Sequence, residues 1–257
     1  MKKLLIRMTA ALVLLFTFVT ASQGQSLPTA PTGSAKAEAA VDEVENLLDR
    51  YVLALGGLKL FSLKSRVMRG RVEMSGVALA GTFEQYEKEH GKSITVVNAP
   101  GGQFLTGTND GKRWMQTPWG ATMSVASAGG TDLLEQARAG KGFRWSNAFS
   151  TAAIKGRATV EGRETVVLAA TPRGGEPLLI YFDAETNLPR KTERVRAGGD
   201  DDLVRAVYFD SYATVDGVKV PALFRQVTAK YTLTFRVTEV KHNVPINDVL
   251  FESPTAK

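Results

Sequence analysis

The sequence predicts an α+β fold in which most of the chain forms one antiparallel sheet. From about residue 65 onwards, apolar and polar residues alternate with period two in many short segments. The segments are separated by short turns containing Gly, Asp or Asn, too short for the crossovers that parallel strands need. A twisted sheet of this size should curl, and something apolar must cover its concave face.

Only two stretches have helical spacing. Val41, Val44, Leu48 and Leu55 recur on one face of a predicted helix that ends at Gly56-Gly57. A second helix is expected from Thr131 to Ala139, with an irregular continuation through residues 143–152. These two apolar helices are the expected cover of the concave face.

The predicted strands follow one another with little between them. They are expected at 67–74, 81–90, 93–97, 103–108, 112–117, 157–160, 164–171, 177–183, 188–196, 203–212, 218–226 and 230–241. The tripeptide Tyr-Phe-Asp occurs at 181–183 and again at 208–210, and we expect each copy to close a strand before a turn. Asp216-Gly217 is a strong hairpin signal.

The N-terminus has the layout of a secretory signal peptide. Three basic residues (Lys2, Lys3 and Arg7) precede an apolar run from Ala10 to Ala21 and then small residues, with cleavage expected after Ala21 or Gly24. An uncleaved membrane anchor is the alternative, although a run of about a dozen residues is short for a span. We assign 1–24 to a signal peptide, 25–35 to a flexible linker and 36–257 to the folded domain, and we expect a periplasmic location.

Composition narrows the class of protein. The chain has 257 residues, of which 44% are hydrophobic, enough for a packed core. Removing the signal peptide lowers the formal net charge from +6 to +3, so nucleic-acid binding is not expected. The chain contains no cysteine, so neither a disulfide framework nor lipid attachment to an N-terminal cysteine is available.

The residues that catalysis needs are sparse, so no enzyme activity, cofactor or metal is expected. His90 and His242 are the only histidines and lack a ligand motif, so both are expected to be exposed strand-end residues. Glu84, Glu87 and Glu89 lie on one predicted strand, where a carboxylate pair could serve as acid and base. Interleaved basic residues favour a solvated strand face instead.

A gap between the helices and the curled sheet would be an apolar pocket. The residues that could line it are large and apolar, although any one of them could equally be ordinary core. They are Trp114, Trp119, Leu133, Leu134, Trp145, Tyr231, Leu233 and Phe235.

The order of these features resembles that of a known superfamily. A helix ending in LALGG, a strand RGRVEM, a hairpin DGKRW and the segments YFDAETNLPRK and VDGVKVPALF resemble the LolA/LolB-like outer-membrane lipoprotein-sorting proteins. The resemblance spans roughly Val41 to Phe251. It implies an incomplete, half-open β-barrel of about 11 strands whose concave face is covered by helices.

The resemblance also implies a function without catalysis or cofactor. The expected role is that of a periplasmic carrier or receptor that binds acyl chains of lipoproteins, or another lipid, in the half-barrel cavity. The alternative is a sensor that uses the same fold to bind an envelope protein partner. Transient contact with a membrane is compatible with either role.

Overall fold

The structure is a computed structural model of the full chain. It describes residues 34–76, 79–109, 112–120, 122–125, 149–173, 176–195 and 206–254. The predicted signal peptide, most of the predicted linker and the predicted second helix at 131–139 lie outside these ranges.

One antiparallel sheet of 13 strands forms most of the described chain, in the order β6-β5-β4-β3-β2-β1-β13-β12-β11-β10-β9-β8-β7. Its strands are β1 (Ser65–Met74), β2 (Leu79–Lys88), β3 (Lys92–Ala99), β4 (Gly102–Asn109), β5 (Lys112–Gln116), β6 (Thr122–Val125), β7 (Phe149–Val160), β8 (Arg163–Pro172), β9 (Leu178–Asp183), β10 (Pro189–Arg194), β11 (Ala206–Val215), β12 (Val218–Val227) and β13 (Thr232–His242). Because β6 and β7 are its two edges, the sheet is open. The predicted antiparallel half-barrel with few helices is confirmed.

The 13 strands exceed the predicted number of about 11, and the four-residue strand β6 is the one that corresponds to no predicted segment. One predicted strand is also longer than expected. The start of β7, Phe149–Ala152, was expected to continue a helix but pairs with β8 instead. Phe149 is buried in the core there, so long-range pairing overrides a local pattern of small residues.

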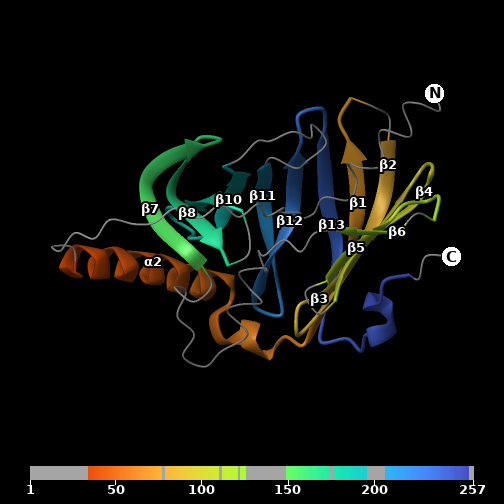
Figure 1. The fold of residues 1–257 in the computed structure, drawn as a ribbon, viewed down its shortest axis with the longest axis horizontal. Helices are drawn as coiled ribbons and strands as arrows, with labels where there is room; N and C mark the ends of the chain where they lie inside the picture. The colour runs from red at the N-terminus through yellow and green to blue at the C-terminus, as the bar shows by residue number, and fades with distance from the viewer. Residues whose placement is uncertain are drawn as a thin grey trace.

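The N-terminal helix packs on one end of the sheet. Helix α2 (Ser34–Leu55) lies against the end formed by β7 and β8 (Figure 1). Gly56 and Gly57 have positive φ angles of 138° and 57°, and they end the helix before the short 3₁₀ helix η1 (Gly57–Ser62). The predicted amphipathic helix is therefore confirmed, and it begins earlier than its apolar pattern.

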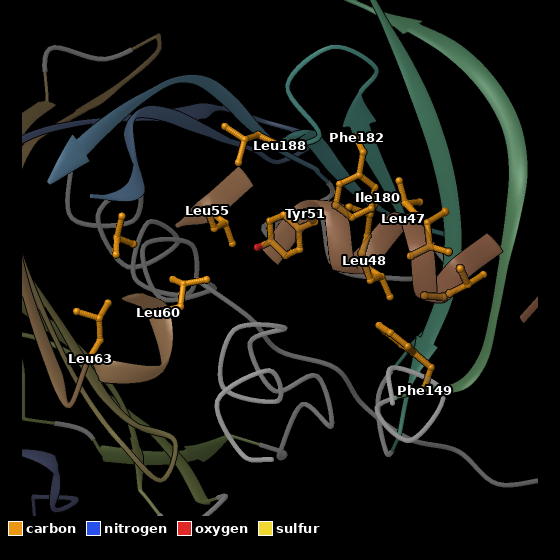
Figure 2. Close-up of a cluster of buried hydrophobic side chains, with 14 residues drawn as sticks. Leu47, Leu48, Tyr51, Leu55, Leu60, Leu63, Phe149, Ile180, Phe182 and Leu188 are labelled. Carbon is orange, nitrogen blue, oxygen red and sulfur yellow. The ribbon is translucent and has the colours of Figure 1, made fainter. Parts of the chain in front are cut away.

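Under α2 lies the first of three apolar clusters, which we call the helix cluster. Figure 2 shows Leu47, Leu48 and Tyr51 of α2 pointing towards Ile180 and Phe182 of β9. The Tyr51 and Phe182 rings meet edge to face, with centroids 5.4 Å apart. The buried members are Val44, Leu47, Leu48, Tyr51, Leu55, Leu60, Leu63, Phe149, Leu168, Ala170, Ile180, Phe182, Leu188 and Val218.

A second cluster, the phenylalanine cluster, occupies the middle of the sheet. Its buried members are Val72, Met74, Phe83, Val97, Val207, Phe224, Leu233 and Phe235. The strand register places it on the same face as the helix cluster, because Ile180 opposes Thr192, which in turn opposes Val207. We call this face, which carries α2, the inner face.

The third cluster lies on the opposite, outer face and holds the C-terminus. Phe251, at the end of the 3₁₀ helix η3 (Asp248–Phe251), is fully buried against Ile94 and Trp114. Trp114 Nε1 donates a hydrogen bond to the Phe251 carbonyl at 3.3 Å. Lys88 and Lys92 pair with Asp248 and lower the pKa of that carboxyl to about 2.

The two Tyr-Phe-Asp copies sit differently in their strands. The first ends β9 as predicted, but the second lies inside β11, which continues through a bulge at Asp210 to Val215. The prediction that each copy closes a strand is therefore wrong for the second. The hairpin predicted at Asp216-Gly217 is confirmed, and both residues have positive φ.

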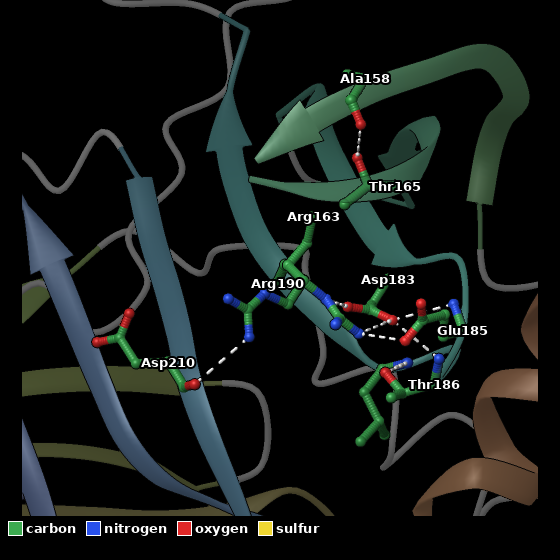
Figure 3. Close-up of polar contacts among 9 residues, drawn as sticks. Ala158, Arg163, Thr165, Asp183, Glu185, Thr186, Arg190 and Asp210 are labelled. Carbon is green, nitrogen blue, oxygen red and sulfur yellow. Dashed lines mark hydrogen bonds and ion pairs between the residues drawn. The ribbon is translucent and has the colours of Figure 1, made fainter. Parts of the chain in front are cut away.

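Both copies nevertheless use the aspartate in the same way, as the acceptor for an arginine on the neighbouring strand. Asp183 accepts from Arg163 of β8 at 3.0 Å (Figure 3), and Asp210 accepts from Arg225 of β12 at 2.8 Å. Asp183 Oδ1 also accepts from the backbone N–H groups of Glu185 and Thr186 in the turn. The repeated tripeptide therefore supplies ion pairs between strands.

Candidate functional site

The inner face is the candidate binding surface, because two of the three apolar clusters lie on it. Phe209, beside the phenylalanine cluster, stacks on Tyr212, beside the helix cluster, with ring centroids 6.1 Å apart. Burial, followed by the nearby Tyr51, raises the pKa of Tyr212 well above its usual value. The Phe209–Tyr212 stack therefore links the edges of the two apolar clusters on the inner face.

Three of the predicted site residues lie together in the middle of this face. Leu233 and Phe235 of β13 are fully buried members of the phenylalanine cluster. Tyr231, just before β13, is half-buried and packs against them. The alternation predicted for this segment is present, since Thr234 points to the other face.

The two predicted tryptophans in the described chain lie in different places. Trp114 is buried, but it opposes Gly107, which opposes Ile94, so all three lie on the outer face. Trp119 is 56% exposed and meets Phe104, which packs against the phenylalanine cluster, edge to face at 6.4 Å. The structure thus separates Trp114 from Leu233 and Phe235 and places Trp119 at the margin of their cluster.

The remaining predicted site residues, Leu133, Leu134 and Trp145, lie outside the described residues. Their role in ligand binding stays a prediction.

A groove of about 360 Å³ opens between α2 and the edge of the sheet. Its rim carries Glu43, Arg50 and Arg157, and its floor is formed by Ile154 and Val166. Ile154 and Val166 also pack against the helix cluster. The groove therefore has apolar lining residues that belong to the surroundings of the helix cluster.

The carboxylates considered for catalysis are tied into ion pairs. Glu84 accepts from Arg69 at 3.0 Å, while Glu87, on the opposite face of β2, accepts from Arg66 at 2.5 Å. Hydrogen bonds from Tyr86 and then Arg69 hold the pKa of Glu84 below its usual value. Glu89 follows the strand in a turn. These contacts favour a structural role for Glu84 and Glu87.

The two histidines differ from each other. His90 is exposed, with a positive φ of 68°, as expected of a turn residue. His242 ends β13, but its side chain is only 2% exposed, and its Nδ1 lies 3.0 Å from Asp216. The expectation of an exposed side chain is therefore wrong for His242, because the 216–217 hairpin precedes β12, the neighbouring strand of β13, and lies against the end of β13. In the part of the chain that the structure describes, no three His, Cys, Asp or Glu side chains gather as metal ligands would.

A basic residue that sequence reasoning missed also lies on the inner face. Arg113 of β5 opposes Thr108 of β4, which opposes Ser93 of β3. Burial, and then the positive charge of Arg194 on β10, lower the pKa of Arg113 to about 10. The alternation around the predicted hairpin could have assigned Arg113 a face, but the nearness of Arg194 depends on the curl of the whole sheet.

Within the described ranges, no helix is long and apolar enough to cross a membrane.

Comparison with known proteins places the fold. No protein-family model and no curated protein sequence matches the chain. A crystal structure of a DUF1329 family protein from Desulfovibrio piger is similar, with a TM-score of 0.56 and 16% identity over 82% of this chain and 99% of that chain.

Two further crystal structures are similar to the same degree. A LolA superfamily protein from Nitrosomonas europaea gives a TM-score of 0.54 and 11% identity over 83% of this chain and 98% of that chain. A putative outer membrane lipoprotein-sorting protein domain from Vibrio parahaemolyticus gives a TM-score of 0.53 and 12% identity over 84% of this chain and 97% of that chain. The resemblance found in the sequence is thus confirmed at the level of architecture: the chain has a LolA-like fold.

Proposed function

We propose that this protein is an exported, periplasmic carrier or receptor that binds the acyl chains of lipoproteins, or another lipid, on the inner face of its half-barrel. The observation that carries the proposal is the pair of apolar clusters that lie on one face of the half-barrel. The Phe209–Tyr212 stack joins the phenylalanine cluster to the helix cluster beneath α2. An elongated apolar ligand needs a surface of this kind.

Binding would use the hydrophobic effect and involve no bond chemistry. Each methylene group that leaves water contributes about 0.8 kcal/mol, so a long acyl chain supplies ample free energy even after its ordering cost. The LolA-like fold and the signal-peptide layout of the N-terminal sequence both support an envelope location.

A sensor that binds a protein partner is the second candidate, and the edge strand β7 is the feature that bears on it. A 12-residue edge strand could pair with a strand of another protein. However, β7 carries a bulge between Ile154 and Gly156, with Lys155 inside it. Bulges and lysines on edge strands oppose such pairing, so the lipid carrier is favoured.

Native mass spectrometry of the protein purified from its source envelope tests the proposal. A co-purifying lipid or acylated protein, released by mild activation, is the expected result. A stoichiometric protein partner without lipid would support the sensor instead. An empty chain that also fails to take up added palmitate would contradict the carrier.

A further inference from the structure

We propose that the inner face binds an amphiphile with an anionic head group, a carboxylate or phosphate, held by the guanidinium group of Arg113. This inference rests on the proposed function, because the chain of the amphiphile would occupy the apolar inner face. It goes further by naming the chemistry of the ligand's head and the residue that recognises it.

The first step is the position of Arg113. In β5, Arg113 and Met115 point to the inner face, while Lys112 and Trp114 point to the outer face. Arg113 Nη1 is buried and finds no hydrogen-bond partner among the described residues. A buried guanidinium N–H without an acceptor is costly, and an anion would satisfy it.

Three other arginines of the sheet have a carboxylate partner. Arg66 pairs with Glu87, Arg163 with Asp183, and Arg225 with Asp210. Among the described residues, no carboxylate lies within ion-pair distance of Arg113. Within the described chain, the position beside Arg113 is therefore open for an anionic ligand.

Arg194 of β10 also lies on the inner face, because it opposes Leu178, which packs against the helix cluster. After burial, its positive charge is the second cause that lowers the pKa of Arg113. Glu176 in turn acts on Arg194. Recognition of the head group is therefore assigned to Arg113 alone.

The inner face changes from polar to apolar along the strands that lead away from Arg113. The row that starts at Arg113 continues with Thr108 and Ser93 on the neighbouring strands. Four residues further along the strands, about 13 Å away, the row of Phe104, Val97 and Phe83 is apolar. A head group at Arg113 would therefore place its alkyl chain over the phenylalanine cluster.

The shape of the guanidinium group determines which head group it prefers. The planar fork of N–H donors in a guanidinium group matches two oxygens of a carboxylate or phosphate. In an apolar surrounding such a charged hydrogen bond is stronger than at the surface. An ester or alcohol of the same chain length would gain only the apolar contacts.

The test compares three probes that share a 16-carbon chain: palmitate, hexadecyl phosphate and methyl palmitate. Dissociation constants are measured by displacement of a fluorescent hydrophobic dye from the mature protein and from two variants, Arg113→Gln and Lys112→Gln. Lys112 is an exposed neighbour on the outer face and serves as the matched control.

The expected result is that wild type binds at least one anionic probe about ten-fold more tightly than methyl palmitate. Arg113→Gln should abolish this preference and leave methyl palmitate binding unchanged, while Lys112→Gln should keep the preference. Preference for palmitate alone indicates a carboxylate head, and preference for hexadecyl phosphate alone indicates a phosphate head. Thermal melting of Arg113→Gln should be no lower than that of wild type, because no ion pair among the described residues is lost.

Two results would overturn the inference while leaving the proposed function intact: equal affinities for the charged probes and methyl palmitate, or an unchanged preference in Arg113→Gln. Failure of all three probes to bind would overturn both.

Discussion

Phe224 and Phe235 stack face to face on neighbouring strands, with ring centroids 4.8 Å apart and ring planes only 3° from parallel. Phe83 meets both rings edge on, at 6.4 Å and 5.3 Å respectively. Three strands are thereby locked together at the centre of the inner face. The same rings are the floor on which we place the acyl chain.

Phe235→Ala is expected to lower the free energy of unfolding by about 3 to 5 kcal/mol, because the ring is 1% exposed and its removal leaves a cavity between Phe83 and Phe224. Urea denaturation measures the loss. Thr234→Ala, one residue away on the outer face, is the control and should change stability by less than about 1 kcal/mol. Unchanged stability combined with weaker palmitate binding would show that the ring belongs to the ligand site alone.

Asp183→Ala is expected to lower the free energy of unfolding by about 2 to 3 kcal/mol. The reason is that the carboxylate is almost fully buried and accepts hydrogen bonds from Arg163 and two backbone N–H groups. Glu185→Ala removes a neighbouring carboxylate that is 77% exposed and also pairs with Arg163. It should be nearly neutral. Equal losses for the two variants would assign the effect to the charge of Arg163 and not to the buried turn.

The stability of the protein should fall in acid, and Asp183 should account for part of the fall. Burial alone would raise the pKa of Asp183, but hydrogen bonds from Arg163 and from the Thr186 and Glu185 N–H groups outweigh it and hold that pKa below its usual value. The stabilisation is therefore complete above the unfolded pKa near 4 and is lost as pH falls through the lower folded value. Urea midpoints between pH 7 and pH 3 should drop less in Asp183→Ala than in wild type. Parallel curves for the two proteins would contradict this assignment.

Phe251→Ala is expected to release the C-terminal segment from the outer face and to lower the free energy of unfolding by about 3 to 5 kcal/mol. Trp114 should then become more exposed, which shifts its fluorescence emission to longer wavelength. Val249→Ala, which truncates a 64% exposed side chain in the same 3₁₀ helix, is the control. If both variants leave fluorescence and stability unchanged, the C-terminal segment does not hold the outer face together.

The sequence was most informative where local rules decide the structure. The amphipathic pattern of α2, its stop at Gly56-Gly57 and the hairpin at Asp216-Gly217 each follow from a few neighbouring residues. The alternation in β13 likewise assigned Leu233 and Phe235 to one face. Periodicity and turn chemistry are sufficient for such features.

Features that depend on distant strands could not be predicted in this way. Alternation shows that Trp114 and Arg113 face opposite sides of β5, but only the register across five further strands shows which side matches Phe235. The nearness of Arg113 to Arg194 requires the curl of the whole sheet. The ends of strands such as β7 and β11 were misjudged because pairing partners, and not local composition, set them.

The most direct test of the account is to map where an acyl chain sits on the folded protein. The mature protein would be irradiated with a palmitate analogue that carries a diazirine midway along its chain, and the labelled peptides would be sequenced by mass spectrometry. The account predicts labels on inner-face residues of β11, β12 and β13, such as Val207, Phe224 and Leu233, and their loss when excess palmitate competes. Labels on the outer-face residues Tyr208 and Arg225, or labelling that palmitate does not reduce, would contradict it.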